Sequence, residues 1–264
     1  MENLLTALSM AWGNFLSLPC PYKRWDNNLK NAMLACLPTI GMVVGVLWLG
    51  LAVGLSLVRL PGILMAALLG FYLHVISGFM HLDGYMDVSD AVMSRRPLEE
   101  KRRILKDSRV GAMAVVSVIF LILMNFASLI IVMSYTFTFS GFAPFLLMPV
   151  ASRAAAGLMV LTMKPMEISQ YAEDYERPRG GLRIALILQV AVYAIAVLSI
   201  SWFWDGMEGY GLIRTGVPAL VTLVGTIGAC LYGNRQLAGM NGDVAGYAIC
   251  LGEVLGLVSL AMMY

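Results

Sequence analysis

The chain has 264 residues, of which 59% are hydrophobic and only 13% are charged. A soluble domain carries roughly 25% charged residues, so the composition excludes an ordinary water-soluble fold. The net charge of +2 indicates no partner by itself, and we expect no nucleic acid partner. The four cysteines lie far apart without a C-x-x-C pair, which indicates neither a zinc site nor a disulfide framework.

The first segment, Met1 to Pro19, is apolar but too short to span a bilayer, and it precedes a Pro-Cys-Pro turn. It lacks a basic n-region and an A-x-A-like cleavage site, so we do not expect a cleavable signal. We predict an interfacial or re-entrant helix here. An eighth element packed inside the bundle is the alternative.

Seven apolar stretches follow, each long enough to cross a hydrocarbon core of about 30 Å as a helix. They predict an all-α, polytopic integral membrane bundle that forms a single domain, residues 1–264. The predicted spans are 33–57, 62–80, 110–134, 142–163, 184–203, 216–233 and 247–264.

Basic residues are distributed unevenly between the two sides of these spans. Of the 18 Lys and Arg, 15 lie on the side that holds the N-terminus, two lie on the other side, and Arg153 lies within a span. The positive-inside rule places the richer side in the cytoplasm. Most acidic residues fall on the same side, so we expect a multi-pass protein of the cell (plasma or inner) membrane with its chemistry at the cytoplasmic face.

An acidic motif stands at the cytoplasmic end of the second span, where the sequence reads His81-Leu-Asp-Gly-Tyr-Met-Asp-Val-Ser-Asp90. In a helix, Asp83, Asp87 and Asp90 share one face. Grouped carboxylates repel one another unless cations neutralise them, and hard oxygen ligands of this kind suit Mg²⁺. A solvated loop whose acids pair with nearby arginines is the alternative. His81 lies on the opposite face, so a role as ligand or general base requires a kink at Gly84.

A basic stretch from Arg95 to Arg109 contains seven Lys or Arg and closes with Lys106-Asp107-Ser108-Arg109. The run as a whole also suits topology or anionic lipid. Its last residues combine an acid, a hydroxyl and a cation, a set that can hold a metal and a phosphate together.

Two further features lie in the later spans. Glycines around Gly242-Asp243 open the last span, where Asp243 offers another hard ligand and helix amides favour an anion. Arg153 and Glu253 lie inside spans, where an ionisable residue is a functional candidate by default. A structural ion pair between them is the alternative.

These motifs together resemble the cobalamin synthase (adenosylcobinamide-GDP ribazoletransferase) family. The resemblance rests on the acidic motif, on Lys106-Asp-Ser-Arg-Val-Gly-Ala112 and on Gly-Asp-Val near the C-terminus. Phe15-Leu-Ser-Leu-Pro-Cys-Pro and Leu37-Pro-Thr-Ile-Gly41 resemble the family's opening motifs, so the likeness covers nearly the whole chain in order.

The resemblance implies that a ribose hydroxyl of α-ribazole, or of its 5′-phosphate, attacks the phosphate next to cobinamide in adenosylcobinamide-GDP, and GMP leaves. Mg²⁺ is the expected cofactor, with Mn²⁺ as a substitute. The expected roles are as follows: metal ligands Asp83, Asp87, Asp107 and Asp243; catalytic residues His81, Asp83, Asp87 and Asp90; and phosphate or substrate contacts Lys106, Ser108, Arg109, Arg153 and Gly242.

Two rival functions stay open at this point. A CDP-alcohol phosphatidyltransferase also spaces acids along helices, although its motif departs from this sequence after Asp83-Gly84. A secondary transporter places its acids near the bilayer midplane. The expected partners are the two substrates and the lipid bilayer. A homo-oligomer, or a complex with other cobalamin-assembly enzymes, is a further possibility that the sequence leaves open.

Overall fold

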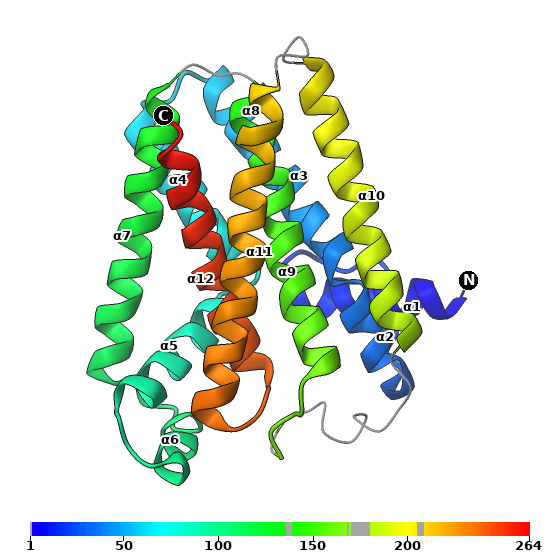
Figure 1. Ribbon diagram of the computed structural model, residues 1–264, viewed down its shortest axis with the longest axis vertical. Coiled ribbons are helices and arrows are strands. Elements are labelled where there is room, and N and C mark those ends of the chain that lie inside the picture. The colour runs from blue at the N-terminus through cyan, green and yellow to red at the C-terminus, as the bar shows by residue number, and fades with distance from the viewer. Residues whose placement is uncertain (1, 136–138, 168, 170–179, 205–208) are drawn as a thin grey trace.

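The structure is a computed structural model that describes residues 2–135, 139–167, 169, 180–204 and 209–264. All regular elements among these residues are helices, and Figure 1 shows the long ones side by side along the vertical. The helices are α1 (Glu2–Phe15), η1 (Asn27–Leu29), α2 (Lys30–Ala35), α3 (Leu37–Leu57), α4 (Gly62–Val75), α5 (Met80–Met93), α6 (Leu98–Ile104), α7 (Ala112–Ser134), α8 (Phe139–Phe142), α9 (Pro144–Thr162), α10 (Gly180–Trp204), α11 (Tyr210–Leu237) and α12 (Gly242–Ala261).

Six of these helices are long and apolar enough to cross a membrane: α3, α7, α9, α10, α11 and α12. They confirm the predicted polytopic helical bundle, and six of the predicted spans coincide with them apart from a few residues at the ends. Two residues of the basic-residue count, Arg177 and Arg179, lie outside the described residues.

The second predicted span, 62–80, is wrong as a single straight helix. α4 ends at Val75, and the chain turns by 83° before α5 begins at Met80. Gly78 (φ 59°) and Phe79 (φ 62°) both adopt the left-handed conformation, which stops a right-handed helix. The prediction failed because it passed over Ser77-Gly78, a turn-favouring dipeptide that stands at the break within an otherwise apolar stretch. The pair counts as a broken span or a re-entrant element.

Glycines bring the spanning helices close together. A Cβ on Gly45 of α3 would lie 2.7 Å from the Leu146 carbonyl oxygen of α9. On α12, a Cβ on Gly252 would lie 2.8 Å from the Thr222 carbonyl oxygen of α11. Small residues of this kind allow helix backbones to approach within a membrane, where packing rather than water drives association.

The N-terminal helix α1 lies across the lower half of the bundle in Figure 1, against α2 and α3. One face is buried through Ala7, Met10 and Ala11. Just after it, Ser17 donates its backbone N–H to the Ile76 carbonyl (2.8 Å) and its hydroxyl to the Val75 carbonyl (2.8 Å). The segment after α1 therefore satisfies the carbonyls left free where α4 ends.

The short basic helix α6 packs under α11 at the lower end of the bundle (Figure 1). Arg102 donates to the carbonyl oxygens of Leu237 (3.1 Å) and Ala238 (3.0 Å), and Lys101 donates to Gln236 (2.6 Å). Cations at a helix C-terminus complement its dipole. Lys101 and Arg102, two of the seven basic residues between Arg95 and Arg109, thus hold α6 against the end of α11.

Candidate functional site

Three aspartates follow one face of α5, as the spacing predicts. Asp83 is exposed, whereas Asp87 and Asp90 are half-buried. The negative charges that act on Asp87 come from Asp83, Asp243 and Asp90, in that order of strength. The fold therefore brings the acid of α12 to the acidic row, and we call Asp83, Asp87 and Asp243 the carboxylate group.

Glycines explain why α5 and α12 approach closely enough for this. A Cβ on Gly84 would lie 2.8 Å from the Asp243 carbonyl oxygen, and a Cβ on Gly246 would lie 3.0 Å from His81 Cα. Asn241 caps α12 by accepting from the Val244 N–H (2.9 Å) and donates to Asp243 Oδ2 (2.7 Å). Asp243 is consequently held in place by its own helix start.

Asp90 differs from its neighbours because both of its oxygens have protein partners. Oδ2 accepts from the Gly111 N–H (2.5 Å) and Oδ1 accepts from the Ala114 N–H (3.0 Å). These are free amides at the start of α7, so Asp90 works as a helix cap that ties α5 to α7. Its oxygens are less available for a ligand than those of Asp83 and Asp87.

The Lys106–Arg109 turn lies between α6 and α7 and is largely open to solvent. Arg109 Nη2 lies 2.7 Å from Asp107 Oδ2, and the Arg109 side chain is 88% exposed. The Arg109 guanidinium lowers the pKa of Asp107 to about 2, so this carboxylate is ionised at neutral pH. The side-chain hydrogen bonds and the ion pair found for Asp107 are all with Arg109, and none of them reaches the carboxylate group. Lys106 and Ser108 are exposed beside it.

Arg153 is placed in the interior of the bundle, where its side chain has 0% exposure. Its Nη1 lies 2.6 Å from Glu253 Oε1, and Ser152 donates to the same oxygen at 2.8 Å. The structure therefore shows the ion pair that was the alternative for Arg153 and Glu253. A buried guanidinium already paired with a carboxylate is not presented to a phosphate at the bundle end.

His81 also lies away from the acidic row, because α5 runs without a break through Gly84. The kink on which a role as metal ligand or general base depends is absent. His81 instead lines a partly open cavity of about 170 Å³ among α1, α2, α3, α5, α9 and α12, which we call the His81 cavity. Asp243 and Gly242 lie at its wall, so the cavity touches the carboxylate group.

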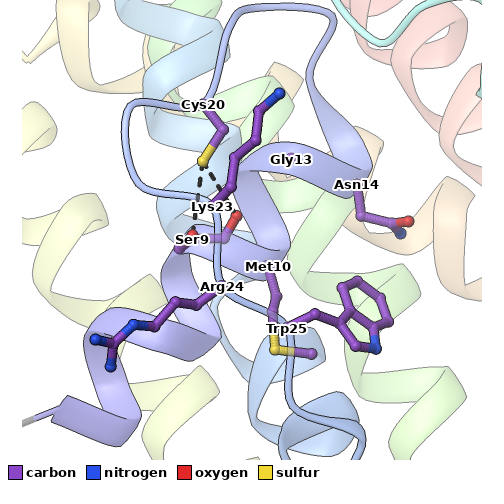
Figure 2. A pocket seen from close by; sticks show the side chains of 8 residues that line it. All are labelled: Ser9, Met10, Gly13, Asn14, Cys20, Lys23, Arg24 and Trp25. Carbon is purple, nitrogen blue, oxygen red and sulfur yellow. Dashed lines mark hydrogen bonds between the residues drawn. The ribbon is translucent and has the colours of Figure 1, made fainter.

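A second cavity, of about 310 Å³, shares the lining residue Asn14 with the His81 cavity. Figure 2 shows its lining side chains on α1 and on the segment that follows, among them Lys23, Arg24 and Trp25, which point in different directions. Arg24 pairs with Glu2 (2.6 Å). Sequence analysis did not identify Asn14 or these residues as site candidates, since the cavity depends on how the segment after α1 folds back against that helix.

No three His, Cys, Asp or Glu side chains within the described ranges are arranged to hold a metal ion together. Mg²⁺ commonly uses one or two protein carboxylates and takes its other ligands from substrate phosphates and water. The mutually repelling oxygens of Asp83, Asp87 and Asp243 suit that type of ion. At the same end, Arg95 and Lys101 line an open cavity of about 710 Å³.

The fold and these side chains define a multi-pass helical membrane protein with an acidic group and basic residues gathered at one end of the bundle. The cobalamin-5-phosphate synthase family model matches residues 7–261. The chain belongs to this family.

Relatives of similar length agree with the assignment. The chain is 33% identical over 264 residues to a Clostridium perfringens (strain 13) protein, with all of both chains covered. It is 34% identical over 266 residues to a protein of Clostridium botulinum (strain Alaska E43), with 98% of each chain covered. It is 30% identical over 241 residues to a Geobacillus kaustophilus protein, covering 88% of this chain and 85% of that protein. All three are named adenosylcobinamide-GDP ribazoletransferase. No solved structure matches the chain.

Proposed function

We propose that the chain is an adenosylcobinamide-GDP ribazoletransferase. It joins α-ribazole, or α-ribazole 5′-phosphate, to adenosylcobinamide-GDP and releases GMP, late in cobalamin biosynthesis. The full-length match to relatives of that name carries this conclusion. The family match from residue 7 to residue 261 does not favour the CDP-alcohol phosphatidyltransferase alternative.

The reaction exchanges one phosphate ester partner for another. A ribose hydroxyl oxygen forms a bond to the phosphorus next to cobinamide, the bond from that phosphorus to the GMP oxygen breaks, and the hydroxyl proton passes to a carboxylate. Catalysis of this kind depends mainly on positioning and on neutralising phosphate charge. The carboxylate group and the basic residues at the same end of the bundle support both tasks.

We assign Asp83, Asp87 and Asp243 to metal binding and proton acceptance, and Asp90 to holding α5 against α7. Mg²⁺, when bound, would offset the negative charge of the diphosphate and of the carboxylates around it. Lys106 and Arg109 are exposed beside the start of α7 and would contact the diphosphate, together with Ser108 and the Gly242 backbone. Asp107 holds Arg109 in place through their ion pair.

We place the site at the cytoplasmic face of the plasma membrane. The basic residues that support this orientation surround the same end of the bundle as the carboxylate group. That position suits polar, water-soluble substrates that reach the protein from the cytoplasm.

A direct assay tests the function. Purified protein in detergent or lipid receives adenosylcobinamide-GDP, α-ribazole or its 5′-phosphate, and Mg²⁺, and GMP release is followed. We expect GMP to appear only when both substrates are present. Folded protein that releases no more GMP than a protein-free control would contradict the proposal.

The same assay tests the metal. EDTA should abolish GMP release, and excess Mg²⁺ or Mn²⁺ should restore it, because the acidic side chains repel one another and the diphosphate without a cation. Full activity in chelator would remove the metal from the mechanism.

A further inference from the structure

The cavity of about 310 Å³ between α1 and the segment that follows it is named the α1 cavity here. Its wall includes Asn14 of α1 and Cys20, Lys23 and Trp25 of the following segment (Figure 2). Cys20 belongs to the motif Phe15-Leu-Ser-Leu-Pro-Cys-Pro, which carries part of the family resemblance. No residue of this motif belongs to the carboxylate group or to the expected phosphate contacts, so the α1 cavity is a candidate for a separate substrate contact.

Lys23 supplies a cation that no described side chain neutralises. Its side chain is exposed and makes no ion pair or hydrogen bond within the described ranges, whereas the neighbouring Arg24 pairs with Glu2. In Figure 2 the Lys23 side chain extends past Cys20, in a direction different from that of Arg24. An unpaired ammonium in a cavity wall favours an anionic ligand, and lysine binds phosphate as a compact point charge.

Two other groups make the α1 cavity suitable for a nucleotide rather than for a bare anion. The Asn14 side-chain amide has no hydrogen-bond partner among the residues that the structure describes, so it is available to a ribose. Trp25 is 57% exposed, and its Nε1 donates to Asn27 Oδ1 (2.8 Å), which restrains the indole ring while much of it stays accessible. Aromatic rings of this kind stack on nucleobases.

Asn14 also relates the α1 cavity to the reaction. It lines both the α1 cavity and the His81 cavity, and the wall of the His81 cavity includes Asp243 of the carboxylate group. The expected diphosphate contacts Lys106 and Arg109 come instead from the turn between α6 and α7. The donor's diphosphate and a ligand of the α1 cavity therefore use different elements of the fold, so the α1 cavity suits the acceptor.

We propose that the α1 cavity binds the acceptor nucleotide and that Lys23 Nζ holds its 5′-phosphate. Lys23 thereby determines specificity, because it makes the protein select α-ribazole 5′-phosphate over α-ribazole. This inference rests on the proposed function and deepens it, since the reaction itself uses only a ribose hydroxyl and does not distinguish the two acceptors.

Equilibrium dialysis tests the contact without relying on turnover. α-Ribazole 5′-phosphate and α-ribazole are dialysed separately against the purified full chain in detergent, without the donor. Wild type should bind the phosphorylated acceptor about tenfold more tightly, which is the effect of one hydrogen bond to a charged group. Lys23→Gln should bind both acceptors alike, with the wild-type affinity for α-ribazole. Lys23→Arg keeps the charge and should keep most of the preference.

Lys30→Gln is the matched control. Lys30 lies further along the same segment, at the start of α2, carries the same charge and does not line the α1 cavity. This variant should keep the wild-type preference. Equal loss in Lys23→Gln and Lys30→Gln would assign the effect to the general positive charge near α1 and overturn the proposal.

A lipid headgroup is another source of phosphate for Lys23. The dialysis is therefore repeated with the protein in nanodiscs of phosphatidylcholine and in nanodiscs that also contain phosphatidylglycerol. The preference for the phosphorylated acceptor should be the same in both. A preference that phosphatidylglycerol abolishes would assign Lys23 to the lipid headgroup and overturn the proposal.

The outcomes separate the two levels of inference. Equal binding of the two acceptors by wild type, or an unchanged preference in Lys23→Gln, would overturn the role of Lys23 even if GMP release is normal. The wild-type comparison requires no variant to fold. Absence of GMP release by wild type would instead count against the proposed function.

Discussion

Asp83 and Asp87 are four residues apart on α5, about one helical turn, and both belong to the carboxylate group. Asparagine has nearly the shape of aspartate but lacks the charge, so Asp83→Asn and Asp87→Asn should leave folding intact. If both acids hold a metal against the diphosphate, either change should lower the rate of GMP release by about 100-fold or more, a barrier increase of at least about 2.7 kcal/mol.

Glu99→Gln is the control for this prediction, because Glu99 lies on α6 outside the carboxylate group. Exposed charge pairs contribute roughly 0 to 1 kcal/mol, so this variant should turn over near the wild-type rate. Similar rates for all three variants, at matched expression and detergent stability, would shift the catalytic centre away from Asp83 and Asp87.

At the scale of elements, the junction of α5 with α7 depends on one side chain. Asp90→Ala removes both hydrogen bonds to the first amides of α7, and loss of a helix cap costs about 0.5 to 2 kcal/mol. Thermal unfolding in detergent should therefore begin at a lower temperature than in wild type. Asp90→Asn keeps one acceptor oxygen and should fall between the two. An Ala variant as stable as wild type would show that the cap contributes nothing.

The contact of α3 with α9 gives a second prediction about elements. Gly45→Ala would place a Cβ 2.7 Å from one backbone atom of Leu146 and 2.8 Å from another. Overpacking of this kind costs typically about 1 to 3 kcal/mol, because the backbone must shift. We expect a lower unfolding temperature and less folded protein after detergent extraction.

Gly50→Ala, on the same helix, provides the comparison, since nothing lies within 4 Å of its added Cβ. Alanine favours a helix over glycine by about 0.5 to 1 kcal/mol, so this variant should be as stable as wild type or more so. If the two alanine variants unfold alike, close approach at Gly45 is not what holds α3 against α9.

For the whole molecule, the distribution of basic residues predicts the orientation in the bilayer. A reporter fused after residue 100 should report the cytoplasm, and one fused at Tyr264 should report the opposite side. Figure 1 agrees with opposite sides, because α6 lies at the lower end of the bundle and the C-terminus at the upper end. If both reporters indicate the same side of the membrane, one of the helices counted as a span does not cross the bilayer.

Sequence patterns predicted most of the bundle, because a long apolar segment in lipid must satisfy its own backbone hydrogen bonds and therefore forms a helix. The break between α4 and α5 escaped prediction, since Phe79 gives no sign of its left-handed backbone. Helical spacing placed Asp83 and Asp87 on one face, but it did not show that Asp90 serves as a cap for α7. Nor did the sequence show that α1 closes a cavity beside His81, because that depends on contacts between segments far apart in the chain.

The 83° turn before α5 changes the direction in which the acidic row of α5 runs relative to α4. Asp83 and Asp90 are seven residues apart, which corresponds to about 10 Å of helix rise. Had α5 continued along the axis of α4, that rise would carry the acids through successive layers of the interface, each with its own dielectric constant. Since α5 instead turns by 83° from the axis of α4, little of this length runs along the direction of α4. The acids consequently form a row that crosses the direction of α4, so that an extended diphosphate lying along α5 can meet more than one of them.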